Sequence, residues 1–181
     1  MRYTQRWLSL WCAIALLVAG CGDGGGGSGR FDDGKLGANN SVSFSVRSAN
    51  GGALDAPVQA VTLSATLPEG TTVATVPGSN TIAPEALTAG GGLTSPSKTV
   101  SGSVTGRVVN IAVATPEEPA IPAGGDLEIA ELKVNAPGTA PFDSANVPCT
   151  ISQAVGFSTV TRSTVDLTAN LLPTVRVKAV Q

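Results

Sequence analysis

The chain has no histidine and few aromatic residues. Its 181 residues include three Cys, one Met, two Trp, one Tyr and four Phe, and 13% of them are charged. Histidine is the side chain that most often acts as a catalytic base, and it is also the commonest metal ligand. A nucleophile activated by histidine is therefore excluded. We expect a protein that is not an enzyme and that has no catalytic residue, cofactor or metal ion.

Runs of basic residues are also missing. The sequence has 11 Lys and Arg against 13 Asp and Glu, which gives a net charge of −2. Proteins that bind nucleic acid usually concentrate positive charge on one face or in one segment. Nucleic acid is therefore not an expected partner. The residues that abound are Val, Ala, Thr, Ser, Gly and Pro, a composition typical of short strands joined by turns.

The first 20 residues have the features of an export signal. Arg2 and Arg6 precede an uncharged run, residues 7–20, that is too short to span a membrane as a helix. The run leads into LVAGC at residues 17–21, which resembles the lipobox of bacterial lipoproteins. The resemblance implies cleavage before Cys21 and attachment of a diacylglycerol to its sulfur.

The expected lipid places the protein in a bacterial cell envelope. Two acyl chains on Cys21 give stable anchoring, because each buried methylene contributes about 0.8 kcal/mol. The residue after Cys21 is Gly22, where Asp favours inner-membrane retention in lipoproteins of the enteric type. We therefore predict that the protein reaches the membrane through its N-terminal lipid, at the outer membrane or the cell surface.

Removal of residues 1–20 takes away every Trp and Tyr. The remaining chain has nine Lys and Arg against 13 Asp and Glu, a net charge of −4, and its only aromatic residues are Phe31, Phe44, Phe142 and Phe157. Sugars usually stack on exposed planar aromatic side chains. Phe142 and Phe157, both beside predicted loops, are the two candidate binding platforms. A protein partner is therefore favoured, and a polysaccharide stays open.

Cys149 is the only free thiol left after processing. With Cys21 lipidated and Cys12 removed, the domain cannot form an internal disulfide, and its stability has to come from a hydrophobic core. No base is present to activate the thiol. We predict that Cys149 is buried in the domain and has a structural role.

The chain divides into three parts. Residues 1–20 are the expected signal peptide, and residues 21–40 are expected to be the lipidated Cys21 and a flexible tether, which opens with GDGGGGSG after the cysteine. Residues 41–181 are the expected folded domain. About 140 residues are enough for a domain to bury roughly two-thirds of its unfolded surface.

Alternating hydrophobic residues predict strands through this domain. SVSFSVR at residues 41–47, RVVNIAVAT at residues 107–115 and TVRVKAV at residues 174–180 each place hydrophobic residues two apart. The pattern predicts an all-β sandwich of eight or nine strands. At most one short helix is expected, near residues 83–88, because Pro84 suits a first helical turn.

One predicted strand changes its alternation. In DLEIAELKV, residues 126–134, Ala130, Leu132 and Val134 share one parity, whereas Leu127 and Ile129 share the other. Either a β-bulge or burial on both faces would explain the change. The acidic residues here, Asp126, Glu128 and Glu131, lack the spacing of a calcium loop and are expected to be solvated.

Two segments resemble cohesin modules. One is VTLSATLPEGTTVAT at residues 61–75, and the other is GDLEIAELKVNA at residues 125–136, which is similar to a cohesin strand at Ile129, Ala130, Leu132, Val134 and Ala136. The resemblance covers about residues 41–181. It implies the jelly-roll-like sandwich that cohesins share with carbohydrate-binding modules, and it implies binding to a dockerin-like protein. No binding residue is carried over from the family.

These observations lead to two hypotheses about function. The first is a non-catalytic, lipid-anchored protein whose cohesin-like sandwich holds a protein, or else a polysaccharide, at the cell surface. The alternative is a structural envelope lipoprotein, a subunit of a surface complex with no connection to dockerins or glycans.

Overall fold

The structure is a computed structural model that describes residues 35–36, 40–54, 56–116, 121–136, 140–141 and 147–178. The expected signal peptide, Cys21 and Phe142 lie outside the described residues.

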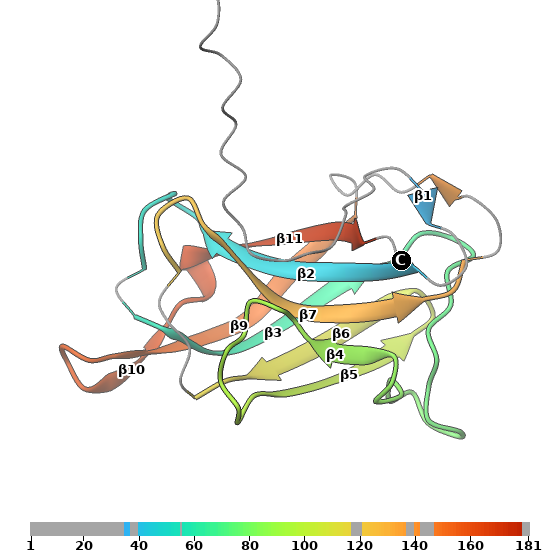
Figure 1. Ribbon diagram of the computed structural model, residues 1–181, viewed down its shortest axis with the longest axis horizontal. Coiled ribbons are helices and arrows are strands. Elements are labelled where there is room, and N and C mark those ends of the chain that lie inside the picture. The colour runs from blue at the N-terminus through green and yellow to red at the C-terminus, as the bar shows by residue number, and fades with distance from the viewer. Residues whose placement is uncertain are drawn as a thin grey trace, which may run out of the picture.

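Nine strands form two antiparallel sheets that pack face to face as a β-sandwich (Figure 1). The five-stranded sheet has the order β10 (Ser163–Asp166), β9 (Cys149–Ser158), β3 (Val58–Thr66), β6 (Val108–Ala114), β5 (Thr99–Thr105). The four-stranded sheet has the order β11 (Leu171–Lys178), β2 (Asn40–Ser48), β7 (Asp126–Val134), β4 (Leu87–Ala89). The predicted fold class is confirmed.

A further pair of very short strands lies apart from the two sheets. Strand β1 (Lys35–Leu36) pairs antiparallel with β8 (Ala140–Pro141). Residues 35 and 36 belong to the segment that the sequence assigns to the flexible tether. Residues 35, 36 and 40 therefore lie in strands, although they precede the expected domain boundary at residue 41.

The core forms where the predicted alternation turns hydrophobic side chains inward. Strand β6 alternates strictly, with Val109, Ile111 and Val113 buried and their neighbours exposed. In β2, Phe44 is completely buried between the sheets, as its alternation with Val42 and Val46 predicts. Side chains point to opposite faces at successive strand positions, so each sheet contributes one inner face to a single core.

The change of parity in β7 is a β-bulge. Phe44 of β2 pairs with Ala130, but the next residue, Ser45, pairs with Glu128, so that Ile129 is an extra residue in β7. The bulge lets Ile129 and Ala130 both be buried, at 1% and 0% exposure. Of the two explanations that the sequence leaves open, the bulge is therefore the correct one.

The short helix that the sequence allows near residues 83–88 does not form. The amide of Ala86 donates to the carbonyl oxygen of Ala83 in a turn, and the chain then enters β4, which pairs with β7. Beside this turn, the amide of Ile82 donates to the carbonyl oxygen of Gly102 on β5. The segment between β3 and β5 thus covers part of the outer edge of β5 and helps to close the sandwich on this side.

The two ends of the sandwich differ. Asn40 and Lys178 lie at one end, where β2 pairs with the last residues of β7 and β11. The opposite end carries the turns at residues 49–54 and 122–125, the short 3₁₀ helix η2 (Thr168–Asn170) and the β9–β10 turn, which projects from the sandwich (Figure 1). We call this second end the loop end.

Candidate functional site

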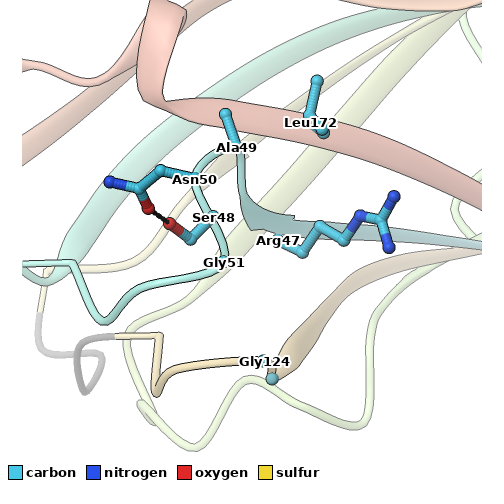
Figure 2. Close-up of a pocket in the computed structure, with 8 residues that line it drawn as sticks. Arg47, Ser48, Ala49, Asn50, Gly51, Gly124 and Leu172 are labelled. Carbon is cyan, nitrogen blue, oxygen red and sulfur yellow. Dashed lines mark hydrogen bonds between the residues drawn. The ribbon is translucent and has the colours of Figure 1, made fainter.

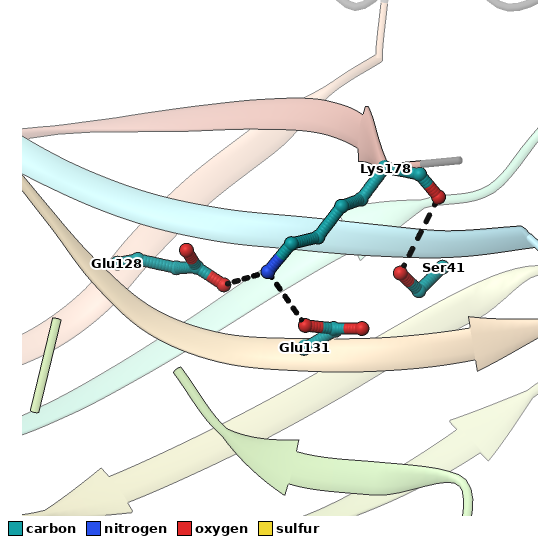
Figure 3. A network of polar contacts seen from close by, with 4 residues as sticks. All are labelled: Ser41, Glu128, Glu131 and Lys178. Atoms are coloured by element: carbon teal, nitrogen blue, oxygen red, sulfur yellow. Dashed lines mark hydrogen bonds and ion pairs between the residues drawn. The ribbon is translucent and has the colours of Figure 1, made fainter. Parts of the chain in front are cut away.

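Five charged side chains lie across the outer face of the four-stranded sheet. Arg176 and Lys178 come from β11, and Asp126, Glu128 and Glu131 come from β7. Lys178 Nζ lies 3.0 Å from Glu131 Oε2 and 3.5 Å from Glu128 Oε1 (Figure 3). Arg176 Nη2 lies 3.2 Å from Asp126 Oδ2. Because β2 runs between β11 and β7, these ion pairs bridge over it, and we call the five residues the charged clasp.

The clasp closes over three serines of β2. Ser41, Ser43 and Ser45 alternate with the core residues and therefore face outward, yet their exposed fractions are only 1%, 2% and 8%. Their small side chains leave room for the long aliphatic parts of Arg176 and Lys178 to cross the strand. The Ser41 hydroxyl also donates to the carbonyl oxygen of Lys178, at 3.4 Å (Figure 3).

The clasp shifts the pKa of two of its members. Burial by itself raises the pKa of Glu131. Hydrogen bonds from Ser41 and Lys178 and the positive charge of Lys178 together lower it by more, so the net shift is downward. Burial likewise disfavours the charged form of Lys178, yet its pairing with Glu131 and Glu128 raises its pKa overall. Both shifts favour the ionised pair at neutral pH.

Replacing Lys178 with methionine should destabilise the sandwich by about 1–2 kcal/mol at pH 7, between the values typical of exposed and buried pairs. The Lys178 side chain is only 20% exposed, and Glu131 would lose its partner. Because the folded pKa of Glu131 is lowered, its contribution is present above the unfolded pKa and is lost as the pH falls through the folded pKa. Urea unfolding at pH 7 and at acid pH measures both effects.

The matched control for this prediction is Lys133→Met. Lys133 is exposed on β7 and has no ion pair within contact distance among the described residues. Its replacement should change the free energy of unfolding little. Equal losses in both variants would mean that the clasp contributes nothing beyond the loss of one surface charge.

Cys149 lies at the start of β9, where it is half-buried against the edge of the core. The prediction that it is buried is therefore correct only in part. Burial raises the pKa of the thiol to about 11, since the thiolate would lose hydration there. Cys149 packs against the hydrophobic core, which agrees with a structural role.

Iodoacetamide should label Cys149 slowly in the folded protein at pH 7, because only the thiolate reacts and little of it forms below a pKa of about 11. In urea the rate should rise by at least tenfold, as the thiol regains an ordinary pKa and full access. Mass spectrometry of timed samples gives both rates. Equal rates in the two states would contradict a packed, desolvated thiol.

The candidate platform Phe157 is the next-to-last residue of β9, beside the β9–β10 turn. Ala154 and Gly156 are buried toward the core, so Phe157 faces the outer side of the five-stranded sheet, where it is half-buried and pairs in register with Thr164 of β10. Phe142 lies outside the described residues. A role for either phenylalanine as a binding platform therefore stays a prediction.

A pocket of about 350 Å³ opens at the loop end, between the turn after β2 and the turn before β7 (Figure 2). It is lined by Arg47, Ser48, Ala49, Asn50, Gly51, Gly124, Gly125 and Leu172. Asn50 Oδ1 accepts hydrogen bonds from the Ser48 hydroxyl, at 2.6 Å, and from the Gly52 amide, at 3.0 Å. The amide of Gly124 donates to the carbonyl oxygen of Gly51 and joins the two turns.

Sequence reasoning did not find either the clasp or this pocket. The prediction that Asp126, Glu128 and Glu131 are solvated is correct for Asp126, which is exposed, but wrong for Glu128 and Glu131, whose side chains are only 16% and 26% exposed and are paired with Lys178. The outward direction of Arg176 and Lys178 follows from alternation, but their carboxylate partners lie about 50 residues away and depend on strand order. Nothing local in the sequence marks Arg47 or Leu172.

In the described part of the chain, no three His, Cys, Asp or Glu residues are grouped closely enough to hold a metal ion. The described residues also contain no helix with the length and hydropathy needed to cross a membrane. In comparisons with known proteins, no protein-family model, no curated protein and no solved structure matches this chain.

Proposed function

We propose that this protein is a non-catalytic, lipid-anchored protein of a bacterial cell envelope, and that its cohesin-like sandwich holds a protein partner at the cell surface. The observation that carries the proposal is the order of its parts. LVAGC at residues 17–21 is followed by a glycine-rich segment, and the sandwich begins at Asn40. A lipid on Cys21 would thus be connected to the sandwich at the end opposite the loop end.

This arrangement supports a role in binding. With the chain entering β2 at Asn40, the loop end is the part of the sandwich farthest from the point of attachment (Figure 1). Val160, in the β9–β10 turn there, is 89% exposed, the highest value among the exposed large hydrophobic residues of the described chain. Surface loops on a rigid scaffold commonly carry binding residues. A protein partner is favoured over a sugar because the processed chain has no Trp or Tyr.

The test is site-specific photo-crosslinking in whole cells. A benzophenone side chain at position 160 should capture an envelope protein, which mass spectrometry of the purified adduct identifies. The matched position is 107, an exposed residue in the β5–β6 turn at the opposite end, where adducts should be fewer. Absence of a protein adduct at both positions, together with tight binding to one oligosaccharide on a glycan array, would replace a protein partner with a glycan.

A further inference from the structure

The loop-end pocket contains a cation, Arg47, that has no counter-ion among the described residues. Arg47 is exposed, and no ion pair or side-chain hydrogen bond joins it to another described residue. Its cross-strand neighbour on β7 is Asp126, whose carboxylate already lies 3.2 Å from the Arg176 guanidinium. Asp126 is thus already paired with Arg176, and no described ion pair joins it to Arg47. Arg47 can therefore accept an added anion, since a planar guanidinium binds a carboxylate with two parallel hydrogen bonds.

The pocket wall beside Arg47 is apolar and partly exposed. Leu172 of β11 is directly opposite Arg47 in the strand register and is 42% exposed. In Figure 2, Arg47 extends along β2, with Leu172 on the strand above it and Gly124 on the turn below. A ligand that presents a carboxylate at the end of a short aliphatic arm would satisfy both groups, because the arm could cover Leu172 while the carboxylate meets Arg47.

Open space lies beside two glycines that line the pocket. A methyl group added at Gly51 or at Gly124 would meet no atom within 4 Å, so neither position is filled from within the protein. The volume of about 350 Å³ is near the lower limit for small-ligand pockets, which suits one side chain better than a polymer. Of the eight lining residues, Arg47 alone carries a charge.

We propose that this pocket receives an acidic side chain, glutamate or aspartate, from the protein partner. The inference rests on the proposed function, and it adds the chemistry of recognition to it. An acidic polysaccharide is disfavoured, because the lining residues include no aromatic ring on which a sugar could stack. The carboxylate of the acidic side chain supplies the negative counter-charge for Arg47, and the methylene groups of the same side chain cover Leu172.

The experiment is an NMR titration of the full processed chain in detergent micelles. The probes are two capped peptides that differ only in their central residue, acetyl-Thr-Val-Glu-Val-Thr-amide and its Gln counterpart. The Glu peptide should shift the Arg47 Nε–H, the amides of Gly51 and Gly124 and the Leu172 methyl signals until they saturate. The Gln peptide should bind about tenfold more weakly, because it loses the charge-assisted pair.

Two variants of matched chemistry complete the design. Arg47→Gln should weaken binding of the Glu peptide by about tenfold. Arg107→Gln, in the exposed turn at the opposite end, should leave the affinity for this peptide unchanged. Equal binding of the two peptides, shifts confined to other residues, or preference for an oligogalacturonate over the Glu peptide would each overturn the inference. If crosslinking at position 160 captures a protein while the Glu peptide causes no shift, the inference fails and the proposed function stands.

Discussion

Replacing Cys21 with serine should move the protein from the membrane fraction into the soluble fraction. Under the proposed function, two or three acyl chains on this residue supply the attachment, and each buried methylene contributes about 0.8 kcal/mol. Serine offers no thiolate to accept the diacylglycerol, so the variant has no lipid with which to bind. Cell fractionation followed by immunoblotting measures the change, and mass spectrometry of the native protein should give an acylated Cys21 as the first residue.

The same chain provides a matched control in its other cysteine. Cys149→Ser removes a thiol from the sandwich and leaves Cys21 in place, so it should stay with the membrane. An unmodified N-terminus at any residue other than Cys21, or a Cys21→Ser protein that remains membrane-bound after a high-salt wash, would contradict lipid anchoring.

The strands were predictable because the alternation of hydrophobic and polar residues can be read from neighbouring positions in the sequence. Val109, Ile111 and Val113 of β6, or Phe44 of β2, take their inward direction from a period of two that any sequence reader can count. The bulge at Ile129 was visible as a change of parity, although alternation alone could not separate it from a strand buried on both faces. The structure decides between these explanations because it gives the partner of each residue on β2.

The turn at residues 83–88 was not predictable from the same local information. Pro84 fits the first turn of a helix as well as it fits a β-turn, and the choice depends on what the following residues meet. In the fold, β4 lies along the edge of β7, where Leu87 pairs with Leu132 and Ala89 pairs with Ala130. This tertiary pairing decides the outcome, in agreement with the small free-energy differences that separate local conformations.

The candidate sites depend on strand order, which alternation does not give. The clasp needs β11 and β7 on either side of β2, with serines at the crossing, and the pocket needs Arg47 opposite Leu172. Each of these groupings joins residues that are far apart in sequence. The sequence could therefore indicate which residues face outward, but it could not indicate which outward residues meet.

Replacing Gly90 with alanine should destabilise the protein by about 3 kcal/mol, the upper part of the range for overpacked positions. Gly90, Gly91 and Gly92 directly follow β4. In the structure, the amide of Gly90 donates to the carbonyl oxygen of Ile129 at the bulge of β7. A methyl group at Gly90 would lie 2.8 Å from the amide nitrogen of Ala130 and in collision with the carbonyl of Glu128. These are backbone atoms in a central strand, so they cannot move aside as a flexible side chain could.

Gly91→Ala is the control, because its methyl group would meet only the end of the Glu128 side chain, at 4.0 Å. Alanine there should be neutral or stabilising by up to about 1 kcal/mol, since it reduces the freedom of the unfolded chain. Urea unfolding of the two variants under identical conditions compares neighbouring residues with the same substitution. A large difference between them requires that Gly90 pack against β7 as described, and equal stabilities would mean that this segment does not lie against the bulge. The comparison therefore tests the contact between the residue that follows β4 and strand β7, independently of any partner or lipid.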